Sequence, residues 1–111
     1  MKAKGYVYFI QCDKWFKIGA TENVYSRFNS IRVCNPFEVS LFHTIKTNNM
    51  HITEKLFQGM FARVEGHGEW FELSDKNLEY IKAGNYTDRI IKSIGEANKA
   101  ITIPDLLSIA G

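Results

Sequence analysis

Four polar side chains in the first half of the chain are of types that can act together on a phosphate group. Tyr8 and Lys17 lie in short aromatic and β-branched segments, whereas Arg27 and Glu54 lie in segments with helical spacing. Phosphodiester hydrolysis needs a polarised phosphate, an activated water molecule and a stabilised leaving oxygen. An arginine and a divalent metal can meet these needs, and one carboxylate suffices for Mg²⁺ when a substrate phosphate and water complete its octahedron. These residues are therefore candidates for such a site if the fold brings them together.

A β-hairpin is predicted to position Tyr8 and Lys17. Residues 5–10 and 15–19 are rich in strand-forming residues and are separated by four polar, turn-capable residues. With a four-residue loop, Tyr8 pairs with Lys17, and both share a sheet face with Tyr6. The opposite face would cover a core with Val7, Phe9, Phe16 and Ile18.

The segment after this hairpin is predicted to form the helix that carries Arg27. Thr21 is a candidate cap for its first turn. Val24, Phe28 and Ile31 recur at the i, i+4 and i+7 spacing of a buried stripe. Arg27 lies about 60° from Val24 around the helix, so its stem can pack while its guanidinium reaches a cleft.

A third strand and a second helix follow, and the helix carries Glu54. We expect residues 38–47 to add to the hairpin as an antiparallel strand, with one face formed by Val39, Leu41, His43 and Ile45. The helix is expected over about residues 50–63, from the spacing of Ile52, Leu56, Phe57, Met60, Phe61 and Val64. Glu54 lies about 100° from the middle of this apolar arc. This angle places Glu54 at the rim, neither buried nor fully exposed.

The last third of the chain is predicted to be mainly helical. Residues 69–73 form a short aromatic segment that should pack against the sheet. Ser74 can cap a helix that ends at Gly84, another helical segment follows Tyr86, and Pro104 can open a last short turn.

These elements predict a single α+β domain. Residues 1–73 would form a small three-stranded antiparallel sheet flanked by helices, and residues 74–111 a helical C-terminal extension packed on the same domain. The 111 residues, 45% apolar and 23% charged, have the composition of one soluble globular domain. Without a membrane span or a signal peptide, and with Cys12 and Cys34 reduced, we expect a cytoplasmic protein.

The charge is distributed unevenly along the chain. Residues 1–63 hold nine Lys or Arg and four acidic residues, a balance of +5, whereas the remaining residues have a balance of −3. A basic half that also carries tyrosines, tryptophan and phenylalanines suits a polyanionic partner, because phosphate contacts and stacking provide sequence-independent affinity. Nucleic acid is therefore the favoured partner.

Several separated motifs resemble the GIY-YIG nuclease superfamily, and most closely its phage-type branch, usually described as a phage DNA-binding domain. The resemblance spans residues 5–73 and is carried by Tyr6-Val7-Tyr8, Lys17-Ile18-Gly19 with a following Thr21, Arg27, Glu54 and Gly68-Glu69-Trp70-Phe71. It implies a fold with a three-stranded antiparallel sheet and the hydrolysis of DNA phosphodiesters with one divalent ion, Mg²⁺ or Mn²⁺. A phage or mobile-element origin, and hence the cytoplasm of a bacterial host, would follow.

The resemblance also implies roles for individual residues. Tyr8 matches a tyrosine that activates or orients the attacking water, and Gly19 matches the glycine of the second motif. Arg27 matches an arginine that contacts the scissile phosphate, and Glu54 matches the acid that binds the metal. The expected catalytic set is Tyr8, Lys17, Arg27 and Glu54, and the expected DNA contacts are Tyr6, Lys17, Gly19, Arg27 and Arg32.

Two positions depart from the pattern of that branch. Lys17 occupies the place of a tyrosine, and a protonated lysine is not a base, although it can neutralise phosphate charge. Phe57 occupies the place of a histidine that often lies three residues after the glutamate. Both departures favour an alternative in which a catalytically silent protein of this fold binds nucleic acid or a host protein, for example as a phage counter-defence factor.

The partners expected for the two hypotheses differ. A nuclease acts on DNA, and without a separate recognition domain it would be weakly specific or recruited by another protein. A third hypothesis is an oligomerisation module, because the isoleucines and leucines of the C-terminal helices could form a dimer surface. The chain would then be a homodimer rather than a monomer.

Overall fold

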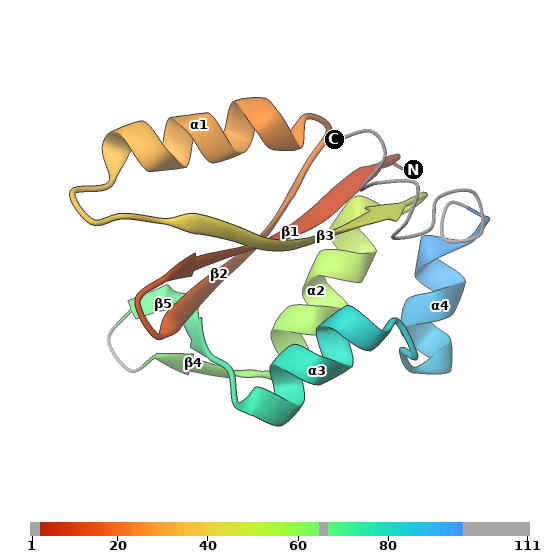
Figure 1. Cartoon of the computed structure of the whole chain (residues 1–111). Coiled ribbons are helices and arrows are strands. Elements are labelled where there is room, and N and C mark those ends of the chain that lie inside the picture. The colour runs from red at the N-terminus through yellow and green to blue at the C-terminus, as the bar shows by residue number, and fades with distance from the viewer. Residues whose placement is uncertain (1–2, 65–66, 97–111) are drawn as a thin grey trace.

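A computed structural model describes residues 3–64 and 67–96 of the chain (Figure 1). It contains a five-stranded sheet, entirely antiparallel, with strand order β3-β1-β2-β5-β4. The elements are β1 (Gly5–Cys12), β2 (Trp15–Thr21), α1 (Val24–Cys34), β3 (Ser40–Thr47), α2 (Met50–Met60), β4 (Ala62–Val64), β5 (His67–Glu72), α3 (Asp75–Ala83) and α4 (Asp88–Ile94). The α+β class is confirmed. The expected number of strands was too small, because the aromatic segment expected only to pack on the sheet pairs with β2 as β5 and brings β4 with it.

The β1–β2 hairpin is tighter than predicted. Its turn contains two residues instead of four, so that Cys12 pairs with Trp15 and Tyr8 lies opposite Gly19 rather than Lys17. Asp13 begins this turn with a φ of 57°, a conformation that Asp tolerates better than most residues. The register differs from the prediction by two residues. Because side chains alternate with a period of two, every residue stays on its predicted face.

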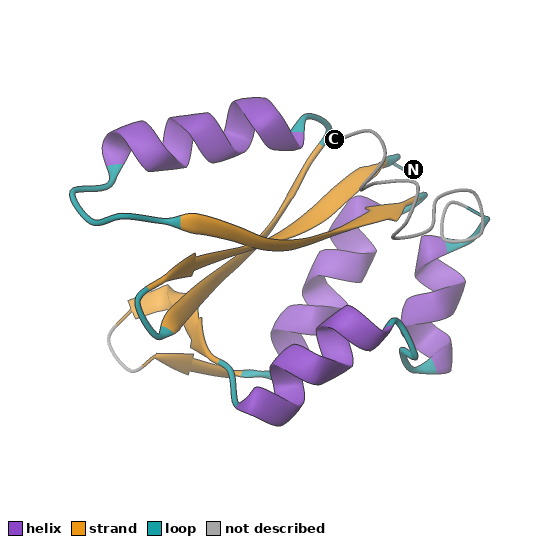
Figure 2. Ribbon diagram, in the orientation of Figure 1, coloured by secondary structure: helices purple, strands orange, loops and turns teal. Residues whose placement is uncertain are grey.

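Helices cover both faces of the sheet. Figure 2 shows α1 alone on one side and α2, α3 and α4 on the other. On the side of the three helices, the core is formed by Val7, Phe9, Ile18, Ile45, Phe57, Phe61, Phe71, Ile81, Tyr86, Ile90 and Ile94. The predicted core residues of the hairpin are all confirmed as buried, with Phe16 in edge contact with Phe42. On the side of α1, a smaller cluster contains Tyr8, Ile10, Cys12 and Val39, with Phe28, Ile31 and Trp70 packed against it.

A β-bulge in β3 overturns the expectation that one face of this strand is apolar. Phe9 pairs with His43, but the next residue, Ile10, pairs with Leu41, so that β3 has one extra residue at this point. The extra residue reverses the alternation. Ile45 therefore joins the larger core, Val39 joins the cluster under α1, and Leu41 is exposed.

The first two helices differ from their predicted limits. Asn23, not Thr21, caps α1, because Thr21 is still paired in β2 and the Asn23 side chain accepts a hydrogen bond from the Ser26 N–H. The apolar stripe predicted for α1 is only partly buried, because only the smaller of the two core clusters lies beneath this helix. Helix α2 ends at Met60, and the chain enters β4 directly. Ile52 and Met60 of the predicted apolar arc are exposed, while Thr53 is buried.

The helices after the sheet follow the local signals. Ser74 caps α3 in a capping box, and Gly84 ends it in the left-handed conformation, as predicted. Helix α4 follows Tyr86, and both α3 and α4 contribute to the larger core. The predicted turn at Pro104 lies outside the described residues. In residues 3–64 and 67–96, no helix is both long and apolar enough to cross a membrane. Within the same ranges Cys12 and Cys34 are free thiols.

Candidate active site at the open edge of the second strand

Tyr8 lies on β1, and its ring packs over Gly19 of β2 at the centre of the candidate site. Its side chain is 4% exposed. The residue opposite is Gly19, where a β-carbon would lie 2.2 Å from the Tyr8 hydroxyl oxygen and 2.3 Å from the ring carbon that bears it. Glycine at position 19 thus leaves the space that the tyrosine ring occupies. Burial raises the pKa of Tyr8; Arg27 opposes this shift, and the charges of Glu54 and Glu69 add to it.

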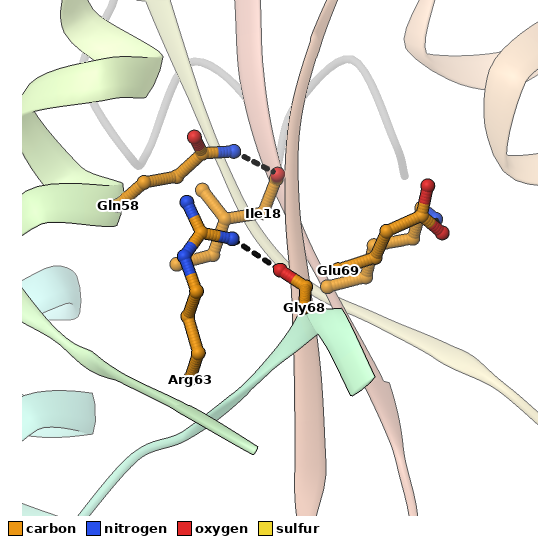
Figure 3. Close-up of polar contacts among 6 residues, drawn as sticks. Ile18, Gln58, Arg63, Gly68 and Glu69 are labelled. Carbon is orange, nitrogen blue, oxygen red and sulfur yellow. Dashed lines mark hydrogen bonds and ion pairs between the residues drawn. The ribbon is translucent and has the colours of Figure 1, made fainter. Parts of the chain in front are cut away.

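Glu54 reaches the site because α2 lies along the edge of β2 that faces away from β1. Among the described residues, β5 pairs with β2 only at Trp15–Lys17, so this edge has no strand partner beyond Lys17. The Gln58 side chain donates a hydrogen bond of 2.9 Å to the Ile18 carbonyl (Figure 3), and the Ala20 N–H donates to the Glu54 carboxylate. Two side chains one turn apart on α2 therefore satisfy backbone groups of this edge.

The environment of Glu54 is half-buried, in agreement with the predicted rim position. The pKa of the Glu54 carboxyl group is raised, mainly because the group is partly buried. His51, the Ala20 N–H and Lys55 oppose this effect and favour the charged form. Glu54 is thus a carboxylate at the boundary between core and solvent, with one hydrogen bond that orients it.

Arg27 acts on Tyr8 from α1, which lies on the opposite face of the sheet from α2. It lies exposed on α1, and its charge lowers the pKa of Tyr8. The charge of Arg27 on α1 and the charge of Glu54 on α2 thus both act on the Tyr8 hydroxyl group. Three of the four predicted catalytic residues, Tyr8, Arg27 and Glu54, are thus near enough to interact electrostatically.

Lys17 lies on the same sheet face as Tyr8 but has partners that the sequence did not predict. Its ammonium lies 3.1 Å from the Glu69 carboxylate and 5.7 Å from the centre of the Trp70 ring. Both partners come from β5, which pairs Lys17 with Trp70. Glu69 was part of the motif used for the resemblance, but nothing in its spacing pointed to Lys17, since 52 residues separate the two.

The remaining predicted residues are less closely associated with Tyr8. Tyr6 is half-buried on β1, two residues from Tyr8 and on the same face. Arg32 is exposed, and its guanidinium donates a 2.7 Å hydrogen bond to Asn29. It lies about 140° around α1 from Arg27. Phe57 is fully buried against Phe9, so this position adds no polar group to the site.

A divalent ion fits this site only if the substrate completes its coordination. In the part of the chain that the structure describes, no group of three or more His, Cys, Asp or Glu side chains could enclose a metal. Glu54 is a single oriented carboxylate at an accessible edge. Mg²⁺ commonly binds through one or two carboxylates, substrate phosphate and water, so Glu54 fits a shared site and not a closed cage.

The chain belongs to the T5orf172 domain family, whose family model matches residues 5–90. This phage-associated domain is related to nuclease folds of the GIY-YIG and HNH-like kinds. The matched segment runs from the start of β1 into α4 and includes every candidate residue discussed above. Comparisons with curated proteins and with solved structures found no significant match.

Proposed function

We propose that this protein is a small metal-dependent DNA endonuclease of the GIY-YIG type. The observation that carries the proposal is the packing of Tyr8 on β1 over Gly19 on β2, with the charges of Arg27 on α1 and Glu54 on α2 acting on the Tyr8 hydroxyl group. A cation and an oriented carboxylate around one hydroxyl group form a suitable setting for a phosphodiester, a divalent ion and a water molecule. Family membership supports a nuclease-related role.

Each of these residues has a role that its environment permits. Arg27 is exposed and binds an oxygen of the scissile phosphate through its planar guanidinium. Glu54 holds Mg²⁺ or Mn²⁺ with a carboxylate that the Ala20 N–H orients. When bound, the ion would polarise the phosphate and stabilise developing charge on oxygen. Tyr8, held in place against Gly19, orients the water through a hydrogen bond of its hydroxyl group.

DNA is the proposed substrate because the charge of the chain favours a polyanion near this site. Nine of the 14 basic residues lie in residues 1–63, which carry Lys17 and Arg27. Phosphate contacts of this kind give affinity without strong sequence preference.

Cleavage assays with a matched variant test the proposal. Supercoiled plasmid, branched DNA and single-stranded DNA would be incubated with the protein and Mg²⁺ or Mn²⁺, with a chelator in parallel. We expect cleavage that the chelator abolishes and that Glu54→Gln lowers by a factor of about 100 or more. Glu72→Gln, at an exposed glutamate on β5, is the control for the loss of one negative charge. Equal cleavage by wild-type protein and Glu54→Gln would remove Glu54 from the site.

A second candidate is a catalytically silent protein that binds nucleic acid. Two observations favour it: the ammonium of Lys17 is already paired with Glu69, and the position of the family's histidine is taken by the buried Phe57. This candidate predicts gel shifts that weaken with salt, together with intact DNA in every metal condition. A role directed only at another protein predicts no DNA binding at physiological salt.

A further inference from the structure

The proposed endonuclease needs a group that takes a proton from the attacking water, and the residues assigned so far do not supply one. The inference below rests on that proposed function. Lys17 and Arg27 are cations, and Glu54 is assigned to the metal. Tyr8 is buried against Gly19 and is assigned to orienting the water. The proton acceptor must therefore be another residue near Tyr8.

Besides Glu54, the candidate site has a second carboxylate, that of Glu69, which lies beside Lys17. One of its oxygens lies 3.1 Å from the ammonium of Lys17, which is on the same sheet face as Tyr8. The side chain of Glu69 is 80% exposed, so water and substrate have access to it. Its ion pair with Lys17 uses one of the two carboxylate oxygens. An exposed carboxylate beside a phosphate-binding cation is within reach of a water molecule that attacks the phosphate.

The protein holds Glu69 in place from both sides. The residue that follows is Trp70, which pairs with Lys17 and lies under its ammonium. The residue that precedes is Gly68, whose carbonyl accepts a hydrogen bond from the Arg63 guanidinium (Figure 3). Arg63 in turn lies 4.7 Å from the centre of the Phe71 ring. The backbone on either side of Glu69 is thus fixed to β2 and β4, which preorganises the carboxylate.

We propose that Glu69 is the proton acceptor for the attacking water and that Lys17 is its positioning residue. The water transfers one proton to the Glu69 carboxylate while its oxygen forms a bond to phosphorus. The bond between phosphorus and the leaving sugar oxygen breaks, and that oxygen takes a proton from solvent. Lys17 then has two tasks that a lysine can perform: it holds Glu69 and neutralises phosphate charge.

This assignment accounts for the lysine in the second motif. A lysine cannot act as the base that a tyrosinate would be, but it can fix a carboxylate that acts as one. Glu69 and Lys17 would therefore form a functional pair contributed by β5 and β2.

The decisive variants are Glu69→Gln, Glu69→Asp and Glu69→Ala, with Glu72→Gln as the control on the same strand. We expect Glu69→Gln to lower the rate of cleavage at saturating DNA by a factor of about 100 or more. Its affinity for DNA should be unchanged or higher, because one negative charge is removed. Glu69→Asp should regain part of the rate, and added formate should partly restore Glu69→Ala, because formate supplies a carboxylate that accepts the proton.

The outcomes separate the inference from the function on which it rests. Wild-type cleavage by Glu69→Gln, together with loss of cleavage in Glu54→Gln, would overturn the role of Glu69 and leave the endonuclease in place. The role is likewise refuted if Lys17→Met lowers the rate as much as Glu69→Ala and formate restores neither, since Glu69 would then act only by holding Lys17. If wild-type protein cleaves no DNA with any divalent ion, the proposed function fails and the role of Glu69 fails with it. Circular dichroism and thermal unfolding would establish that each variant is folded.

Discussion

At the scale of single residues, the packing of Tyr8 against Gly19 is the tightest constraint on the candidate site. The tyrosine ring fills the space in which a side chain at position 19 would lie. The ring is buried by the cluster under α1, so it has little room to move away. The second motif thus needs its glycine for packing in the free protein, whatever its role towards DNA.

We expect Gly19→Ala to destabilise the fold by about 1–3 kcal/mol, because the added methyl group overpacks a buried site. Urea unfolding would measure this cost. The control is Gly59→Ala on α2, where a β-carbon meets no atom within 4 Å. Since alanine is the better helix former, Gly59→Ala should stabilise the protein by about 0.5–1 kcal/mol. A Gly19→Ala variant as stable as the wild type would show that Tyr8 has room to shift.

The half-buried Glu54 carboxylate predicts a dependence of stability on pH. Its pKa is raised in the folded state, so the folded state binds this proton more tightly than the unfolded state does. The stabilising contribution is complete below the unfolded pKa of about 4.3 and is lost as the pH rises through the folded pKa. Glu54→Gln keeps an acceptor for the Ala20 N–H without the charge, and should therefore unfold at a higher temperature than the wild type at pH 7.

This difference in melting temperature should shrink as the pH is lowered below about 4, where the wild-type carboxyl is also neutral. Thermal unfolding from pH 3 to pH 8 would follow it, with Glu72→Gln as the control for an exposed carboxylate. A Glu54→Gln variant less stable than the wild type at pH 7 would contradict the prediction. A gain in stability with a loss of cleavage is the pattern expected of a residue kept for function.

At the scale of elements, α2 takes the place of a strand at the edge of β2. Strand β5 pairs only with Trp15–Lys17 of β2, and Gln58 and Glu54 bond to the backbone at Ile18 and Ala20 instead. The same contacts set the position of α2 relative to Tyr8. The protection of the sheet edge and the placement of the proposed metal ligand thus depend on the same helix.

Gln58→Met tests this arrangement, because methionine has a similar size but no donor for the Ile18 carbonyl. We expect a loss of about 1–3 kcal/mol in the free energy of unfolding, the cost of a part-buried carbonyl without its partner. Faster hydrogen exchange in β2 and slower DNA cleavage should accompany it. Met60→Gln, at an exposed position of α2, is the matched control and should leave stability, hydrogen exchange and cleavage unchanged. Unchanged stability in Gln58→Met would mean that water replaces the amide.

At the scale of the whole molecule, the sheet separates two unequal layers of helices. Helices α2, α3 and α4 build the larger core on one face, whereas α1 alone covers the other face and carries Arg27 and Arg32. The basic residues are concentrated in residues 1–63, and the rest of the chain has an excess of acidic residues. A bound polyanion should therefore contact the half with α1 and the hairpin.

DNA affinity should fall as salt rises, and the slope should identify the residues that contact phosphate. Arg27→Ala and Lys17→Ala should each reduce the slope of log affinity against log salt by about 1. Lys92→Ala removes an exposed charge from α4 and should leave the slope unchanged. Fluorescence anisotropy with a labelled duplex from 50 to 300 mM salt would measure the slopes. Equal slopes for all three variants would place the DNA on another surface.

The sequence by itself determined those features that depend on local periodicity and local chemistry. The faces of the hairpin were correct although its register was not, because the alternation of side chains survives a shift of two residues. Ser74 and Gly84 marked the ends of α3 because capping involves only neighbouring residues. The rim position of Glu54 followed from helical geometry alone.

Only the tertiary structure decided the contacts between residues far apart in the chain. The bulge in β3, the fit of Tyr8 against Gly19 and the approach of α2 to the edge of β2 all depend on how packed elements meet. The pairing of Lys17 with Glu69 depends on β5 joining the sheet beside β2. Spacing along the chain does not reveal these contacts, because strand order and the length of each strand pairing are set by the packing of the whole domain.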